Sequence, residues 1–309
     1  MTVMTQVLVL FLLIVVGFSS RRLNIVSKQM DTDFGNLITK VTLPAFVLSS
    51  MDYDFSYDAL LESMNLLKVS ACIYAVVILA SFIIVKWMPI SRDKVDIYQF
   101  AISFTNVGFM GYPVISLVYG SQGVFYAAIY NLSYNILIWT YGIYLLKRHQ
   151  EDARVSTIGE KVKDIFNPGL VAIILGFILF LTPLSFPEPI QRTLSLIGST
   201  TTPLSMMFIG LLLAEIHLKE LINSLQDYFI IAIRLLIIPF VVLIVLSRMG
   251  FEGYMLGIPV LISAMPIAAN SAVFASIYGG NSKLASKLVF LSTLISVITI
   301  PFFMIKLGS

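Results

Sequence analysis

The stretch SFTNVGFMGYP at residues 103–113 and its counterpart SAMPIAANS at residues 263–271 decide the fold. Each places a proline beside an asparagine and small polar residues, inside a long apolar segment. Proline removes a backbone N–H and clashes with the preceding turn, but it fits the first turn of a new helical segment. We therefore expect each segment to form two half-helices, with breaks near Gly111–Pro113 and Met265–Pro266.

The composition indicates that these segments lie in a lipid bilayer. The chain has 309 residues, of which 58% are hydrophobic and 12% charged, and its mean hydropathy is +0.92. Soluble domains carry about 25% charged residues, so this chain has roughly half the expected solvating surface. The net charge of +3 is too small for the electrostatic footprint of a nucleic-acid-binding protein.

Hydropathy predicts ten membrane-spanning helices, because a helix needs about 20 apolar residues to cross the hydrocarbon core. The predicted spans are 3–20, 36–51, 65–88, 97–118, 123–146, 168–183, 194–215, 228–248, 254–278 and 284–306. The first span lacks a basic segment before it, so we expect a retained helix rather than a signal peptide.

The charges of the loops predict the orientation of these spans. If the amino terminus is outside, the outer segments contain only three basic residues, Arg192, Arg248 and Lys306, and all the other loop lysines and arginines lie inside. The segment 52–62 is then outside as well, and it is acidic. The positive-inside rule favours this arrangement, a multi-pass protein of the cell membrane with both termini outside.

An internal repeat is the next expectation. The polar stretch 148–166 separates residues 1–147 from residues 167–309. A shift of 159 positions aligns Gly17-Phe18 with Gly176-Phe177, and the same shift aligns two further pairs. Those pairs are Thr42 and Pro44 with Thr201 and Pro203, and Tyr119-Gly120 with Tyr278-Gly279. Because five crossings is an odd number, the second half is inverted, as in many transporters. The predicted fold class is an all-α membrane protein of two inverted five-helix repeats, with broken helices 4 and 9 crossing.

The two breaks are the predicted substrate site. A broken helix is tolerated in a bilayer only where its backbone faces protein or a water-filled cavity. The half-helix after each proline offers backbone N–H groups and a positive dipole end. No Asp or Glu lies centrally in a predicted span, so this positive region suits a small organic anion, a mono- or dicarboxylate. The predicted substrate-binding residues are Asn106, Gly111, Pro113, Met265, Pro266, Asn270, Asn131 and Asn135.

Several alternatives stay open at this point. Prolines and asparagines inside a span also serve plain packing, and Asn131 and Asn135 either line the cavity or bond to a neighbouring helix. Arg234, Lys40 and Lys68 are expected to extend their charged ends to the membrane interface. The residues leave open coupling to H⁺ or Na⁺ and a homodimer.

The sequence shows no pattern typical of an enzyme or of a metal site. The two histidines fall in polar segments with no cysteine or paired histidine nearby, so we expect no metal site and no cofactor. An intramembrane enzyme would need a nucleophile with a base, paired aspartates within a span or a histidine-rich motif, and none occurs. We therefore expect a transporter rather than an enzyme, with an intramembrane enzyme as the rival from another class.

The same residues resemble the auxin efflux carrier family, whose bacterial members are described as malate or malonate permeases. The resemblance extends over nearly the whole chain. It rests on Leu43-Pro44-Ala45, the segment 106–113, Asn167-Pro168 with Leu175-Gly176, the segment 203–210, and the segment 266–270 followed by Tyr278-Gly279.

This resemblance implies a ten-helix fold like that of bile-acid sodium symporters, so a sodium-coupled symporter of that type is the alternative function. It implies a scaffold of helices 1, 2, 6 and 7, past which the remaining helices move as an elevator. By position, Asn106 and Pro113 match the first crossover motif, and Pro266 and Asn270 match the second. The long central loop of the plant carriers is short here, so neither regulation by that loop nor auxin transport is expected.

Overall fold

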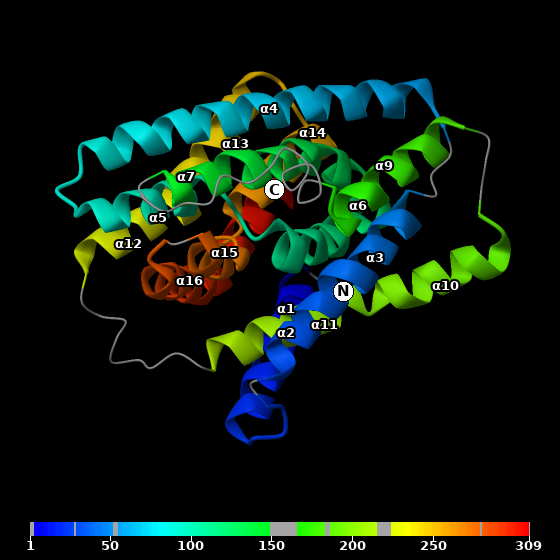
Figure 1. Ribbon diagram of the computed structural model, residues 1–309. Coiled ribbons are helices and arrows are strands. Elements are labelled where there is room, and N and C mark those ends of the chain that lie inside the picture. Colours follow the sequence, from blue (N-terminus) through cyan, green and yellow to red (C-terminus); the bar gives the residue numbers. More distant parts are fainter. Residues whose placement is uncertain are drawn as a thin grey trace. The chain divides into compact units, whose positions relative to one another are not determined.

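The computed structural model describes residues 3–27, 29–51, 55–148, 166–182, 186–214, 224–278 and 280–308 (Figure 1). Within these ranges the regular structure is helical, apart from one isolated β-bridge. The chain divides into two compact units, and each is described by itself. The first unit comprises Met1–Leu66, Gly108–Leu132 and Phe166–Ile216, and the second comprises Leu67–Val107, Ser133–Ile165 and His217–Ser309.

Six helices lie wholly in the first unit and seven wholly in the second, among the described residues. Those of the first are α1 (Val3–Arg22), α2 (Met30–Leu37), α3 (Leu43–Ser50), α9 (Pro168–Leu181), α10 (Glu188–Ser199) and α11 (Thr201–Leu213). Those of the second are α5 (Arg92–Ser103), α7 (Ile143–Lys147), α12 (Leu225–Ala232), α13 (Ile238–Arg248), α14 (Gly253–Ala264), α15 (Asn270–Tyr278) and α16 (Ser282–Gly308). Two more, α4 (Tyr57–Lys86) and α6 (Tyr112–Leu137), contribute to both units.

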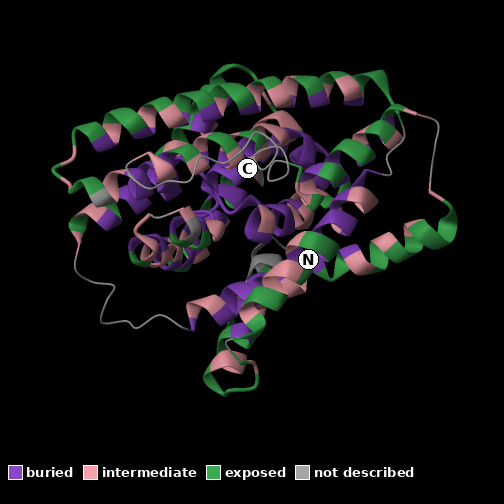
Figure 2. Cartoon of the chain, in the orientation of Figure 1, coloured by how far each residue is buried: buried purple, intermediate pink, exposed green. Residues whose placement is uncertain are grey.

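Four described helices are long and apolar enough to cross a membrane, and they coincide with four predicted spans. They are Tyr57–Lys86, Glu188–Leu213, Leu225–Arg248 and Ser282–Leu307. Figure 2 shows exposed residues along α4, and several of these are apolar, including Val76 and Leu79. Apolar side chains on an outer helix face are suited to lipid, so the chain is a multi-pass membrane protein.

In the first unit, α1 packs against α11 with their backbones in direct contact. A Cβ atom on Gly17 would lie 2.0 Å from the carbonyl oxygen of Met207, and one on Gly210 would lie 2.1 Å from that of Ile14. Small residues allow helices to approach this closely in membranes. Similarly, α9 packs on α3, where Gly176 faces the side chain of Met51.

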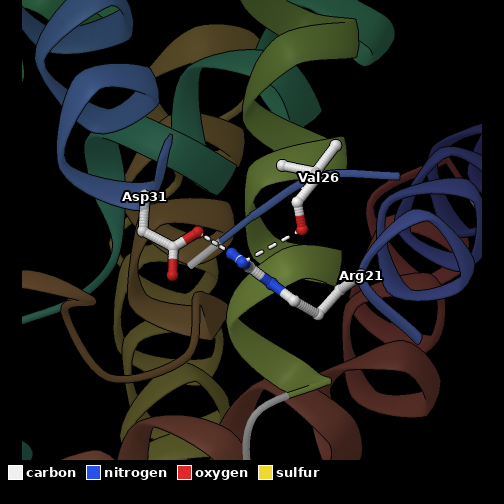
Figure 3. A network of polar contacts seen from close by, with 3 residues as sticks. All are labelled: Arg21, Val26 and Asp31. Atoms are coloured by element: carbon white, nitrogen blue, oxygen red, sulfur yellow. Dashed lines mark hydrogen bonds and ion pairs between the residues drawn. The ribbon is translucent and has the colours of Figure 1, made fainter. Parts of the chain in front are cut away.

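An ion pair fixes the connection between α1 and α2 in the same unit. Arg21, at the end of α1, points at the carboxylate of Asp31 in the first turn of α2 (Figure 3). Its guanidinium also donates to the carbonyl of Val26 at 3.2 Å, so one side chain holds both the loop and the next helix.

One ion pair and one hydrogen bond to a carboxylate fasten α5 within the second unit. Asp227 of α12 is buried; it accepts a hydrogen bond from the Tyr98 hydroxyl at 2.5 Å and pairs with Lys287 of α16 at 2.7 Å. Arg148, which follows α7, donates to Asp96 at 2.6 Å. These carboxylates lie in the first five residues of α12 and α5, where each is held by a basic partner.

The two units do not follow the predicted halves 1–147 and 167–309, because each unit draws segments from both. The repeat therefore stays a prediction about how the halves correspond. The predicted connecting loop, 148–166, lies outside the described residues except for its two ends.

Candidate functional site

Both predicted broken helices are interrupted within the second unit. Helix α5 ends at Ser103, and Phe104 takes an extended conformation with φ −117° and ψ 128°. Helix α14 ends at Ala264, and Met265 is extended with φ −66° and ψ 148°. The next helix after this second break, α15, begins at Asn270.

The two interruptions meet and run antiparallel. The N–H of Asn106 donates to the carbonyl of Pro266 at 2.8 Å, and the N–H of Ala268 donates to the carbonyl of Phe104 at 3.1 Å. We call Phe104–Asn106 together with Pro266–Ala268 the crossover bridge. Because unpaired backbone groups are costly in a bilayer, each open segment satisfies the other.

The centre of the crossover bridge is the pair Thr105 and Ile267. Both residues are buried, and the N–H of Ile267 donates to the hydroxyl of Ser292 in α16 at 3.2 Å. A third helix thus contributes to the bridge.

The position of the first break differs from the prediction. The break lies at Phe104–Asn106 instead of Gly111–Pro113, whereas the second break includes Met265–Pro266 as predicted. Pro113 is the second residue of α6 and follows a π-helical turn over Val107–Gly111. A proline near a helix start loses no essential hydrogen bond, and the wide turn accommodates its ring.

Arg234 is the residue for which the sequence prediction is wrong. Its side chain is only 2% exposed, so it does not extend to the interface. Its guanidinium donates to the carbonyl of Ile102 at 3.0 Å and to that of Ser263 at 2.9 Å. These carbonyls belong to the last turns of α5 and α14, directly before the two breaks. Its near-central place in the apolar run 225–248 was the available signal, because a charge inside a span is often functional.

The asparagines fall into different surroundings. Asn106 is buried in the crossover bridge, while Asn270 and Asn135 are half-buried. Asn131 is buried in the first unit, where its amide donates to the Tyr112 hydroxyl at 3.0 Å. Both residues belong to α6, so this hydrogen bond does not decide between the two roles predicted for Asn131.

Part of the predicted set comes together within the second unit. Asn106 and Pro266 meet at the crossover bridge, Met265 directly precedes it, and Asn270 begins the helix that follows it. Gly111, Pro113 and Asn131 belong to the first unit. Among the described residues, no group of three His, Cys, Asp or Glu side chains could hold a metal ion.

The family model and the relatives that match this chain all carry the names of transport proteins. A family model described as "Membrane transport protein" matches residues 2–304. The chain is 26% identical to an "Uncharacterized transporter" of Methanothermobacter thermautotrophicus, over 97% of each chain. It is 25% identical to an "Uncharacterized transporter" of Methanocaldococcus jannaschii, over 96% of each chain. A Rhizobium meliloti protein named "Putative malonate transporter" is 23% identical over 65% of this chain and 63% of its own length.

Proposed function

The chain belongs to the membrane transport protein family, and from that premise we propose that it is a secondary transporter of small organic anions. The family and the transporter-named relatives also identify a transporter rather than an enzyme, and they confirm the family resemblance predicted from the sequence. The proposal adds the cargo, the mechanism and the placement in the cell membrane with both termini outside.

The observation that carries the proposal is the crossover bridge. Extended backbone at membrane depth is tolerated where it is buried in protein or lines a cavity, and transporters use such interrupted helices at their binding sites. The bridge joins α5 to the segment before α15 through two main-chain hydrogen bonds. Two interrupted helices joined in this way are expected at the substrate site of a transporter.

The chemistry near the bridge favours an anion. Helix α15 starts at Asn270, and the first turn of a helix carries N–H groups without intrahelical partners and a partial positive charge. The carboxylates Asp96 and Asp227 of the same unit are engaged by Arg148 and Lys287. A small carboxylate is therefore the best-matched cargo, and malonate, named for one relative, is the first to test.

We assign the substrate contacts of the second unit to Asn106, Met265, Pro266, Asn270 and Asn135. The amides supply donors, and the prolyl segment holds them in place through the crossover bridge. The contributions of Gly111, Pro113 and Asn131 stay predictions from the sequence.

The mechanism we propose is alternating access, in which an elevator-type movement carries the crossover between the two membrane faces. Ten helices in two inverted repeats would provide this movement. The reciprocal packing of α1 on α11 and of α9 on α3 supports such a repeat, because exchanging the halves converts one pair into the other.

Uptake by the purified protein in liposomes tests the function. We expect saturable accumulation of radiolabelled malonate, with competition by other small mono- and dicarboxylates and none by organic cations. Protein-free liposomes provide the background. Flux that never saturates would identify a pore, and no uptake of any carboxylate would refute the proposed cargo.

A further inference from the structure

Arg234 occupies an unusual position for a charged side chain. It lies in the π-helical turn Ile233–Ile237, which joins α12 to α13 within the apolar run Leu225–Arg248. Turns of this kind often occur at functional sites. A buried charge is costly unless it is compensated, so its partners explain why it is kept.

Those partners are the carboxyl ends of both interrupted helices. The guanidinium donates to Ile102 at the end of α5 and to Ser263 at the end of α14, at 3.0 and 2.9 Å. Each helix end carries about half a negative elementary charge. One guanidinium therefore balances two such ends, and it does so with a fork of donors that a single lysine ammonium lacks.

The same helix ends have another known use. In many transporters with discontinuous helices, unwound carbonyls and half-helix carboxyl ends coordinate the coupling Na⁺ or H⁺. Here the corresponding carbonyl oxygens accept hydrogen bonds from a covalently attached cation.

We propose that Arg234 is a built-in cation that takes the place of a coupling sodium ion at the crossover, so that anion transport by this chain does not depend on Na⁺. The claim that transport is independent of Na⁺ rests on the proposed function. The claim that Arg234 holds the carboxyl ends of α5 and α14 concerns the fold alone. Because the charge is permanent, the crossover is assembled in every state of the transport cycle without an ion being taken up or released.

The first experiment uses the wild-type protein with malonate as the probe. Uptake into liposomes is measured with Na⁺ or choline in the medium, at equal ionic strength and equal membrane potential, and the thermal unfolding midpoint is measured in the same two salts. We expect equal uptake rates and equal midpoints. An uptake rate or a midpoint that rises in Na⁺ overturns the proposal.

The second experiment removes the built-in cation. Arg234→Ala should lower the unfolding midpoint and abolish uptake in choline, and added Na⁺ or guanidinium should restore part of both, because a small cation can enter the vacated place. Arg234→Lys keeps the charge but not the fork, and we expect an intermediate midpoint. Arg248→Ala, at the exposed end of the same helical run, is the matched control and should behave as wild type in both salts.

The outcomes separate this inference from the proposed function. If the wild type transports no carboxylate, the function fails, while the midpoints of wild type, Arg234→Ala and Arg234→Lys still decide what holds the helix ends. An unfolding midpoint equal to that of the wild type for Arg234→Lys or Arg234→Ala in choline overturns the inference. So does an Arg234→Ala protein that neither small cation restores. If Arg234→Ala does not fold, the lysine variant and the sodium dependence of the wild type remain decisive.

Discussion

At the residue scale, Asn106 has two functions that can be separated. Its backbone N–H belongs to the crossover bridge through the 2.8 Å bond to Pro266, and any residue except proline supplies that group. Its amide side chain is buried, with 3% exposed, and is the part that we assign to the substrate. A substitution that truncates the side chain therefore spares the bridge.

We expect Asn106→Ala and Asn270→Ala each to abolish malonate uptake while membrane insertion and the unfolding midpoint stay close to wild type. The reason is that each loses amide donors but keeps the backbone. Uptake in liposomes and thermal unfolding in detergent measure the two effects.

Asn281→Ala is the control and should show the reverse pattern, with normal uptake and a lower unfolding midpoint. Asn281 accepts a hydrogen bond from the Leu284 N–H at 3.0 Å, and losing this cap costs about 1 kcal/mol of stability. Undiminished uptake by both site variants would refute the assignment.

Only part of the site is visible in the sequence at this scale. The paired asparagines and prolines are visible because they are rare inside apolar segments. The partners of Arg234 are not visible, because Ile102 is 132 positions away and no local pattern encodes that pairing. An arginine that extends to the interface and one that is buried have the same sequence neighbours.

At the element scale, two prolines of similar appearance have different effects. Pro266 lies in extended backbone, whereas Pro113 lies in the first turn of a helix after a π-helical turn. The sequence predicts that a proline disturbs a helix, but the neighbouring backbone decides where the break occurs. Helix starts are missed for a related reason. The predicted span 194–215 leaves out the polar segment 188–193, yet this segment is the first part of α10.

Helix contact in the first unit gives a test at this scale. Gly210→Ala would place a methyl group against the backbone of α1, 2.1 Å from the Ile14 oxygen, so the two helices must separate. We expect a loss of about 2 kcal/mol of stability, typical of overpacking, seen as a lower unfolding midpoint. Gly108→Ala makes the same change where the nearest atom lies 3.5 Å away, an ordinary contact, and should be neutral. Equal midpoints for the two variants would contradict the described packing.

At the scale of the whole molecule, hydropathy and loop charge predict how the chain lies in a membrane, which the contacts between residues do not reveal. The apolar excess predicts a multi-pass membrane protein, and this is confirmed. The orientation in the membrane is predicted from the charge distribution alone. The number of crossings depends on whether an interrupted helix is counted as one span. Both stay predictions, as do the inverted halves.

Reporter fusions test the orientation. If both termini are outside, alkaline phosphatase fused after Lys306 should be active in cells, and green fluorescent protein at the same point should be dark. A phosphatase inserted within 148–166 should give the opposite result, because this loop is predicted to lie inside with its basic residues. The same activity at both positions would show that the number of crossings between them is even rather than odd.

The crossover bridge also bears on how such a protein evolves. Its two hydrogen bonds use only main-chain atoms, at Phe104, Asn106, Pro266 and Ala268. Mutations that change the surrounding side chains, and with them the cargo, leave this joint intact as long as no proline replaces a donor. The side chains around the bridge can therefore change one substitution at a time while the main-chain connection between the two interrupted helices is inherited unchanged.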